Sequence, residues 1–351
     1  MAKTYSVIGV MSGTSLDGVD LLYCSLRADK AWSFQIHTAT TYGYSNKWLE
    51  QLKNAHRWSL PQVEALDKDY TQLLAELINR FVKDNKLTKI DFIASHGHTI
   101  WHQPEEGQTY QIGNLPDLAS LTGQKVVCDF RVQDVALGGQ GAPLVPIGDR
   151  LLFGEFDACV NLGGFANISF EKHNRRIAYD ICPVNKVLNV YANKLGKEFD
   201  ESGAIARASV ANPELVAQLD NLQFYSKPPP KSLGTEWLEA EFFPHLKLAG
   251  LSSEELIATC TTHFAHQIAN AIAGHQKVLF TGGGAFNTYL MELISAETEA
   301  EIIIPEPEVI NYKEALIFGL LGVLKVRGED NVLASVTGAQ SNHSSGSIYG
   351  S

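Results

Sequence analysis

The sequence predicts an α/β protein made of two similar halves with a cleft between them. Three strand-like segments open the chain, and a second strand-rich stretch begins after residue 157. In each half, segments whose apolar residues recur at helical spacing follow these strands. This repetition of strands followed by helices indicates a duplicated α/β fold. With 351 residues, the chain is long enough for two domains that each bury a core.

The first half contains five predicted strands and one long helix. Apolar alternation and β-branched runs place the strands at 5–10, 18–26, 33–42, 91–95 and 125–129. The helix begins after the third strand, because Ser59 is a typical N-cap residue and Pro61 suits a first helical turn. Its apolar residues recur at helical spacing: Leu66, Tyr70, Leu73, Leu74, Leu77, Ile78 and Phe81.

The second half is predicted to be mostly helical after its opening strands. The strands are expected at 158–162, 165–170, 175–181, around 278–280 and at 300–305. The helices are expected at 185–195, 202–209, 213–220, 234–246, from 253 onward, after 287 and at 311–328. The Gly/Ser-rich stretch 337–351 is expected to be a poorly ordered tail.

Composition restricts the partners and the compartment. The net charge of -11 and the lack of a long basic run argue against nucleic acid or an anionic membrane surface as partner. The five cysteines are scattered and form no CxxC pair, which favours a reducing compartment over a disulfide framework. No apolar run reaches signal-peptide or membrane-span length. A soluble, cytoplasmic protein is therefore expected.

The stretch MSGTSLDGVD at residues 11–20 carries more small and polar residues than a hairpin requires. Gly13 and Gly18 free the backbone for close approach to a ligand, and successive N–H groups there can bind an anion. Hydroxyl groups and carboxylates that can contact phosphate or a metal come from Ser12, Thr14, Ser15, Asp17 and Asp20. A plain hairpin turn with Asp17-Gly18 at its apex explains the same residues.

Two further glycine corners lie in the second half. TGGGAFN, residues 281–287, joins a strand to a helix, which is an arrangement that lets a nucleotide lie against the backbone. NLGGFANIS, residues 161–169, is a glycine hairpin that can bind phosphate. Each is also compatible with a tight turn, and neither is a Walker A loop or a dinucleotide fingerprint. Several such corners in one chain favour a nucleotide site.

Single polar residues suggest the chemistry. Asp180 ends a strand, where a carboxylate can act as a general base, although a turn aspartate is the simpler alternative. Arg131 follows a strand and suits an anionic ligand or, alternatively, a salt bridge between domains. Asn311 and Glu314 open the last helix and either cap it or face the cleft.

Three histidines in SHGHTIWHQP suggest a metal site only weakly. His96, His98 and His102 have no neighbouring carboxylate that would complete a familiar ligand set. Lining of a substrate cleft is the favoured interpretation. A metal hydrolase that uses these histidines stays open as an alternative.

Six ordered motifs together resemble the anhydro-N-acetylmuramic acid kinase family. They are GVMSGTSLDGVD, SHGHTIWH, DFRVQDVALGGQGAPLVP, NLGGFANIS, TGGGAFN and NYKEALIFGLL, and they span about residues 6–325. The resemblance implies two ribonuclease-H-like (actin-like ATPase) domains around a central nucleotide cleft, ATP with Mg²⁺, and a homodimer that acts in peptidoglycan recycling. The expected domains are 1–140, completed by the C-terminal helix, and 141–327, with 328–351 as a tail.

The family's reaction couples two events. Water opens the 1,6-anhydro bridge of 1,6-anhydro-N-acetylmuramic acid, and the freed O6 takes the γ-phosphoryl group of ATP. The resemblance makes Asp180 the catalytic base that activates this water. It implies substrate contacts from His96, Arg131, Asn185 and Glu314. It implies ATP contacts from Gly13, Thr14, Ser15, Leu16, Asp17, Gly18, Val19, Asp20, Asn161, Gly163, Gly164, Gly282, Gly283 and Gly284. No residue is assigned as a metal ligand.

The sequence departs from the family pattern beside the implied base. The family has Asp-x-Gly-Pro-Gly-Asn, whereas this chain has Cys182 and Val184 in place of the two glycines. The backbone there is expected to approach the ligand differently. A kinase for another 1,6-anhydro sugar such as levoglucosan is the nearest alternative, and a non-catalytic ATP-binding protein of the same superfamily is a second.

Overall fold

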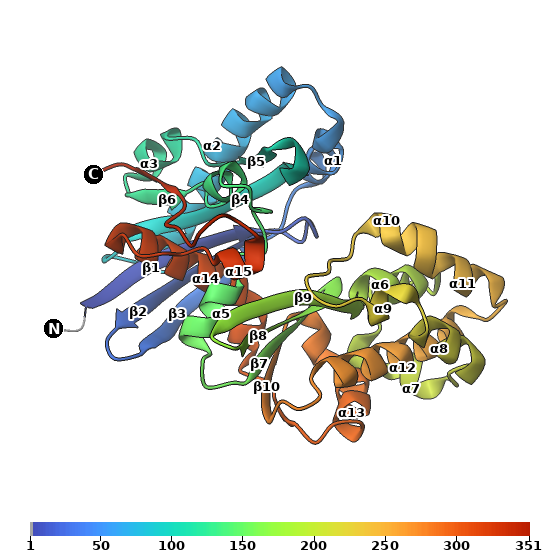
Figure 1. Cartoon of the computed structure of the whole chain (residues 1–351). Coiled ribbons are helices and arrows are strands. Elements are labelled where there is room, and N and C mark those ends of the chain that lie inside the picture. The colour runs from blue at the N-terminus through green and yellow to red at the C-terminus, as the bar shows by residue number, and fades with distance from the viewer. Residues whose placement is uncertain (1–2) are drawn as a thin grey trace. The chain divides into compact units, whose positions relative to one another are not determined.

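Each half of the chain forms one mixed β-sheet, and the two sheets share a strand order. The computed structural model describes residues 3–351 (Figure 1). The chain divides into two units. Unit 1 contains the residues up to Leu152 and those from Tyr312 onward, and unit 2 contains Phe153–Asn311.

The sheet of unit 1 begins with an antiparallel meander. Its strands are β1 (Lys3–Ser12), β2 (Val19–Ala28) and β3 (Trp32–Tyr42). On the other side of β1, the parallel strands β4 (Phe92–Gln103) and β6 (Val126–Cys128) continue the sheet. Two antiparallel strands were not predicted, β5 (Gln108–Ile112) on β4 and β12 (Ser347–Tyr349) on β6.

The sheet of unit 2 repeats this order and these directions. Its meander is β7 (Ala158–Leu162), β8 (Phe165–Lys172) and β9 (Arg175–Pro183). The parallel strands β10 (Lys277–Thr281) and β11 (Glu301–Ile303) follow on the other side of β7. A meander followed by two parallel strands, present twice, is the ribonuclease-H-like arrangement, so the predicted fold class is confirmed.

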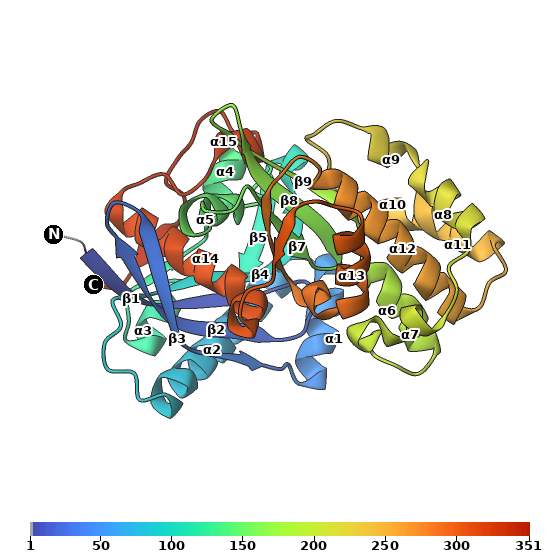
Figure 2. The same cartoon turned by 90° about the horizontal axis from the view of Figure 1, so that it is seen from below.

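Helices cover both faces of the unit 1 sheet (Figures 1 and 2). Ile8 packs in one cluster with residues of α2 (Leu60–Asp84), whereas Val7 lies against Gly319 of α14 (Pro307–Arg327). Because successive strand residues point to opposite faces, α2 and α14 lie on opposite sides of the sheet. The approach of α14 is close, since a Cβ on Gly9 would lie 1.9 Å from the carbonyl oxygen of Ala315.

The remaining helices are short in unit 1 and more extensive in unit 2. In unit 1 they are α1 (Asn46–Asn54), α3 (Asp117–Thr122), α4 (Val132–Ala136), α5 (Pro146–Leu152) and α15 (Ala334–Thr337). In unit 2 they are α6 (Asn185–Lys194), α7 (Ala204–Ala208), α8 (Pro213–Asp220), α9 (Gln223–Ser226), α10 (Thr235–Trp237), α11 (Phe243–Leu248), α12 (Ser253–Ala271) and α13 (Thr288–Ala296).

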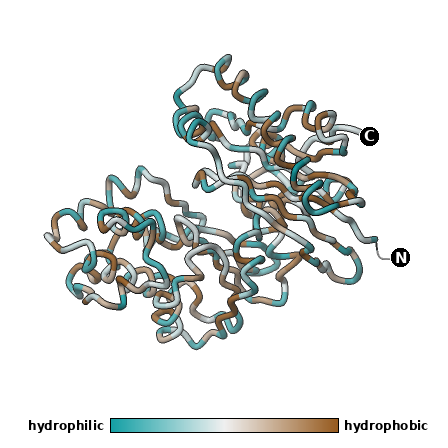
Figure 3. The backbone as a smooth tube through the Cα atoms, turned by 180° about the vertical axis from the view of Figure 1, so that it is seen from behind, coloured by the Kyte–Doolittle hydropathy of each residue, from teal (hydrophilic) through white to brown (hydrophobic). Residues whose placement is uncertain are grey.

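Polar residues at the N-termini of α2 and α12 explain where these two long helices begin. At the start of α2, the side-chain oxygen of Gln62 accepts a 2.9 Å hydrogen bond from the Ser59 N–H group. At the start of α12, Ser252 and Glu255 exchange such bonds at 2.8 and 3.2 Å, which is a capping box. Apolar residues gather inside each unit (Figure 3), where α12 buries Ile257, Phe264 and Ile268.

The C-terminal stretch corrects one prediction. Residues 337–351 were expected to be poorly ordered, but they carry β12, and Ser345 is fully buried with its hydroxyl donating to the Phe130 carbonyl at 2.7 Å. Composition alone misled here, because small polar residues also suit tight packing against a sheet edge. Unit 1 also contains 141–152, whereas the boundary was expected at residue 140. Among residues 3–351, no helix is long and apolar enough to cross a membrane.

Candidate active site

The β1–β2 corner of unit 1 presents polar groups to solvent. Gly18 has a φ of 148°, and a Cβ there would lie 2.5 Å from the Tyr42 carbonyl oxygen, so only glycine fits. Thr14, Ser15 and Asp17 are exposed. Within residues 3–351, no hydrogen bond engages the backbone N–H groups of Thr14 and Ser15. Adjacent free N–H groups and hydroxyls are a chemically suitable cradle for phosphate oxygens.

Ser12 supports this corner from inside. Its hydroxyl lies 2.6 Å from the Tyr44 hydroxyl and 2.8 Å from His98 Nδ1, and Tyr44 continues the chain to Tyr70 at 2.6 Å. Ser12 is buried, so its hydroxyl is committed to these partners. The expectation that Ser12 donates to phosphate is therefore not met, while His98 gains a structural role.

Asp20 lies on β2, just after the corner. Its Oδ1 accepts a 2.6 Å hydrogen bond from the Thr41 hydroxyl, which leaves Oδ2 available. Burial raises the pKa of Asp20, the bond from Thr41 opposes this shift, and the charge of Asp17 adds to it. Mg²⁺ takes oxygen ligands, often one or two carboxylates together with substrate phosphates. Asp17 and Asp20 fit such a role.

Arg131 and His96 form a fixed pair in unit 1. Arg131 Nε donates to His96 Nε2 at 2.9 Å, and its NH1 donates to the Gly141 carbonyl at 2.9 Å. Because His96 Nε2 accepts a bond while Nδ1 lies 2.9 Å from the Gly97 carbonyl, the ring is the neutral Nδ1–H tautomer. Burial lowers the pKa of His96 well below its usual value, and the Arg131 charge lowers it further.

Glu314 provides the opposite charge near Arg131. It lies on α14 and is accessible to solvent, although partial loss of hydration raises its pKa while the charge of Arg131 opposes that shift. Burial lowers the pKa of Arg131 to about 10, and Glu314 and Asp134 oppose this, so Arg131 stays charged at neutral pH. A guanidinium and a carboxylate together suit a polar, hydroxyl-rich ligand. The partners of Arg131 lie within unit 1.

In unit 2, the Gly163–Gly164 turn is tied to the start of α6. The Gly164 carbonyl accepts from the N–H groups of Val184 and Lys186 at 2.9 and 3.2 Å, and the Gly163 carbonyl accepts from Asn185 at 3.3 Å. The side chain of Asn185 also donates to the Leu162 carbonyl at 3.4 Å. Asn161, Gly163 and Asn185 are half-buried, so ligand can reach them.

Asp180 lies on β9 opposite Asn167, beside a bulge that follows Ala166. Bulges re-aim side chains near functional sites. Asp180 Oδ2 accepts from the Leu233 N–H group at 2.8 Å, whereas no hydrogen bond engages Oδ1 within residues 3–351. Burial raises the pKa of Asp180, and the bond from Leu233 opposes this. One oxygen is thus fixed and the other can take a proton.

The loop after β10 needs two of its three glycines for packing. Gly282 has a φ of 81°, and a Cβ there would lie 2.7 Å from Asn161 Oδ1. A Cβ on Gly284 would lie 2.7 Å from the Leu162 Cβ, whereas one on Gly283 would meet nothing within 4 Å. Gly282 and Gly284 therefore let the loop lie directly on β7, and Gly283 is exposed.

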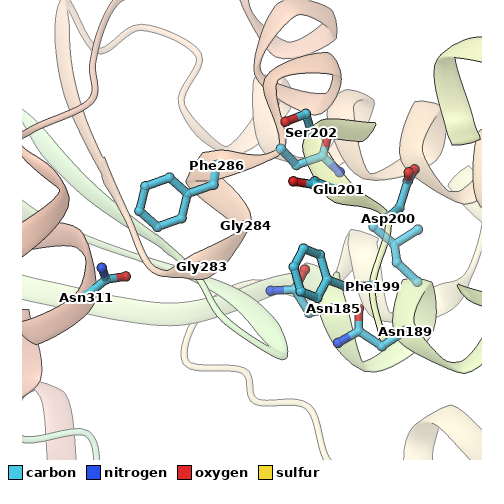
Figure 4. Close-up of a pocket in the computed structure, with 12 residues that line it drawn as sticks. Asn185, Asn189, Phe199, Asp200, Glu201, Ser202, Gly283, Gly284, Phe286 and Asn311 are labelled. Carbon is cyan, nitrogen blue, oxygen red and sulfur yellow. The ribbon is translucent and has the colours of Figure 1, made fainter. Parts of the chain in front are cut away.

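A pocket of about 470 Å³ opens beside this loop (Figure 4). Its size suits a small organic ligand. Gly283, Gly284 and Asn185 line it, so it brings together residues that were predicted from two separate motifs. Its lining also includes residues that were not predicted to bind ligand: Leu188, Asn189, Phe199, Asp200, Glu201, Ser202, Phe286 and Asn287. Asn311, which was expected either to cap the last helix or to face the cleft, lines it too.

The missed residues had one usable signal in the sequence. Asp200 accepts from the N–H groups of Ile205 and Ala206 at 2.7 and 3.0 Å, and Ser202 has a φ of 55°. The run DESG at 200–203 is therefore a turn that precedes a helix, which its composition indicates. Nothing local in the sequence marks the exposed rings of Phe199 and Phe286 as pocket residues.

The three histidines of the SHGHTIWHQP motif are engaged by neighbouring side chains. Gly97 has a φ of 74°, and β4 continues through it. His96 and His98 are occupied by Arg131 and Ser12, and His102 Nδ1 lies 3.2 Å from the Thr109 hydroxyl. In the described part of the chain, no group of three or more His, Cys, Asp or Glu side chains is arranged to hold a metal ion.

Comparison with known proteins decides the family. The family model described as "Anhydro-N-acetylmuramic acid kinase" matches residues 5–351. The chain belongs to the anhydro-N-acetylmuramic acid kinase family. It is 33% identical over 365 residues to the anhydro-N-acetylmuramic acid kinase of Shewanella putrefaciens, with 96% of each chain covered. It is 31% identical over 366 residues to that of Sulfurimonas denitrificans, with 97% of this chain and 98% of the relative covered.

Solved structures resemble the chain more distantly. The activator of 2-hydroxyisocaproyl-CoA dehydratase from Clostridium difficile, with bound ADPNP, gives a TM-score of 0.44 at 14% identity, with 92% of this chain and 97% of that chain covered. A ligand-bound xylulose kinase from Lactobacillus acidophilus gives a TM-score of 0.44 at 10% identity, with 98% and 93% covered.

Cys182 and Val184 replace the two glycines of the anhydro-N-acetylmuramic acid kinase family pattern, and neither residue has a left-handed backbone conformation. Cys182 is buried in the strand β9, and Val184 has a φ of −138°. Cys182 has the extended conformation of a strand, whereas Val184, with a ψ of −95°, lies outside the main regions that L-residues occupy. The two replacements therefore add buried side chains on unit 2 and leave Asp180, Pro183 and Asn185 in place.

Proposed function

We propose that the protein is an ATP-dependent kinase that opens the 1,6-anhydro ring of 1,6-anhydro-N-acetylmuramic acid and phosphorylates O6, which gives N-acetylmuramic acid 6-phosphate. Family membership over residues 5–351 supports this activity. The observation that carries the mechanism is Asp180, with one carboxylate oxygen fixed by Leu233 and the other left for a proton.

In this mechanism, Asp180 Oδ1 takes a proton from water as the water oxygen bonds to C1 of the sugar. The C1–O6 bond breaks, and the electron pair stays on O6. O6 then attacks the γ-phosphorus of ATP, the bond to the β–γ bridging oxygen breaks, and ADP leaves. Such a reaction requires mainly positioning and charge stabilisation, together with one well-placed base.

The proposal assigns the other residues as follows. The corner from Gly13 to Asp20 binds ATP phosphates, and the pocket beside Gly282–Gly284 binds the adenosine, with Asn161, Gly163 and Gly164 nearby in unit 2. His96, Arg131, Asn185 and Glu314 bind the sugar. Asp17 and Asp20 would hold Mg²⁺, which would neutralise phosphate charge when bound. The free N–H groups of Thr14 and Ser15 support the phosphate assignment.

We also propose that the protein works as a cytoplasmic homodimer in peptidoglycan recycling. Cys24, Cys128, Cys182 and Cys260 are buried and unpaired, which suits a reducing compartment. The substrate is a fragment of cell wall, so an enzyme that releases such fragments must act before this one. Size-exclusion chromatography with light scattering measures the oligomeric state.

The test replaces the base. We expect Asp180→Asn to lower kcat by at least about 100-fold, as for loss of a general base, while ATP binding measured by calorimetry stays unchanged. Product formation is followed as ADP release with 1,6-anhydro-N-acetylmuramic acid, and levoglucosan is assayed in parallel. Asp330→Asn, an exposed aspartate away from the site, serves as control. Normal turnover of Asp180→Asn contradicts the mechanism, and turnover of levoglucosan alone changes the substrate.

A further inference from the structure

The segment that fixes Asp180 is an irregular stretch between α9 and α10. It touches Asp180 twice, since the Asp180 N–H group donates to the Lys231 carbonyl at 3.1 Å and Oδ2 accepts from Leu233 N–H at 2.8 Å. Residues 227–234 belong to neither a helix nor a strand. A stretch without a ladder of backbone bonds needs side-chain anchors to keep one position.

Lys231 provides such an anchor. Its Nζ donates to the carbonyl oxygens of Phe224 and Tyr225 at 3.2 and 3.3 Å, at the C-terminal part of α9. A cation is favoured there by the helix carbonyls. The ammonium also lies 4.6 Å from the ring centre of Phe224 and 5.6 Å from that of Tyr179, the neighbour of Asp180 on β9.

The helix that holds Lys231 is itself fixed by buried polar groups. Tyr225 lies 2.9 Å from His263 Nε2, and His263 Nδ1 lies 2.6 Å from Asp220 Oδ1. Because the carboxylate accepts from Nδ1, Nε2 accepts from the Tyr225 hydroxyl. A continuous series of contacts therefore runs from α12 through α9 and Lys231 to the carboxylate of Asp180.

We infer that Lys231 is a positioning residue for the reaction: it holds the 231–233 segment so that the Leu233 N–H group fixes Asp180 Oδ2 and turns Oδ1 toward the attacking water. This inference rests on the proposed function, because it takes Asp180 as the base. Lys231 acts through the backbone and contacts no substrate.

The test removes the ammonium and keeps the length of the side chain. We expect Lys231→Met to lower kcat about 10- to 100-fold, as a small misplacement of a catalytic group does, with little change in the KM for ATP. The acid limb of the kcat/KM profile moves to higher pH, because a weakened bond from Leu233 stabilises the carboxylate less and raises the pKa of Asp180. A merely structural role does not move that limb.

Two variants control for charge and for folding. Lys227→Met removes an exposed lysine that lines the same small pocket as Lys231, and we expect wild-type kcat and pH profile. Lys231→Arg keeps donors for the two carbonyls and restores most of kcat. If Lys231→Met does not fold by circular dichroism, Lys231→Gln, which retains one donor group, is measured with the same readouts.

The outcomes separate this inference from the proposed function. A wild-type kcat and an unmoved acid limb in a folded Lys231→Met enzyme overturn the positioning role alone, provided that Asp180→Asn is inactive. An active Asp180→Asn enzyme overturns the base assignment, whatever Lys231 does.

Discussion

At the scale of single residues, many polar side chains near the candidate site hold the fold, and few are left for ligand. Ser12 and His98 occupy each other, and His96 is engaged by Arg131. Asp180 Oδ1 and the hydroxyls of Thr14 and Ser15 are, by contrast, without hydrogen-bond partners in the described chain. The contacts, and not residue type alone, therefore separate the side chains that hold the fold from those that are left for a ligand.

Asp220 gives a residue-scale prediction about pH. Its burial opposes ionisation, but hydrogen bonds from His263, His266 and Gln267 outweigh this and lower its pKa from 3.8 to about 2. The ionised carboxylate therefore stabilises the fold above about pH 4, and this contribution is lost as pH falls toward 2. We expect Asp220→Asn to lower the free energy of unfolding at pH 7 by on the order of 1 to 2 kcal/mol.

The measurement is urea unfolding of both proteins at several pH values. The difference between wild type and Asp220→Asn should be constant from pH 7 to pH 5 and shrink below pH 4. The exposed Asp330→Asn serves as the matched control. A difference that is independent of pH down to pH 2.5 contradicts the assigned shift.

At the scale of elements, the turn after β10 depends on where side chains can be placed. A Cβ on Gly282 meets Asn161 and the Leu162 backbone at 2.7 to 2.9 Å, in a left-handed conformation. We expect Gly282→Ala to destabilise unit 2 by at least about 1 to 3 kcal/mol. Gly283→Ala, whose Cβ enters open space, should stay within about 0.5 kcal/mol of wild type.

Urea unfolding of the two variants checks this pair. Because they differ by one position in the same turn, propensity and composition effects are matched. Equal destabilisation by both would show that the close contact with β7 does not matter. A changed ATP affinity of Gly282→Ala together with an unchanged free energy of unfolding would also contradict the packing role.

The elements that the sequence predicted best are those with strong periodicity. The strand meanders, α2 and α12 carry long apolar patterns and caps such as Ser59 and Ser252, so local physics specifies them. Of the strands missed, β5 is a short strand that folds back on the adjoining β4. The other, β12, is a short edge strand whose pairing with β6 depends on contacts far along the chain. The pocket residues Phe199 and Phe286 were missed for the same reason, since only the fold brings them together.

At the scale of the whole molecule, the chain leaves unit 1 and returns to it. Unit 2 is continuous in sequence and has its own core, whereas unit 1 is completed by residues 312–351. The part of α14 in unit 1 buries seven large apolar side chains: Leu316, Ile317, Phe318, Leu320, Leu321, Val323 and Leu324. The sequence predicted this helix and its completing role, but its contact with β1 through Gly9 has no local signature.

This asymmetry predicts how fragments behave. Each buried side chain of α14 contributes about 1.5 to 3 kcal/mol. Loss of the helix therefore removes an amount comparable to or larger than the total stability of about 5 to 15 kcal/mol that a domain typically has. We expect residues 153–311 alone to unfold cooperatively in urea, as followed by circular dichroism, and residues 1–152 alone to show no cooperative transition. Co-expression of 1–152 with 307–351 should restore it, because α14 then covers β1. Cooperative unfolding of 1–152 without that helix would show that one covered face suffices for the sheet of unit 1.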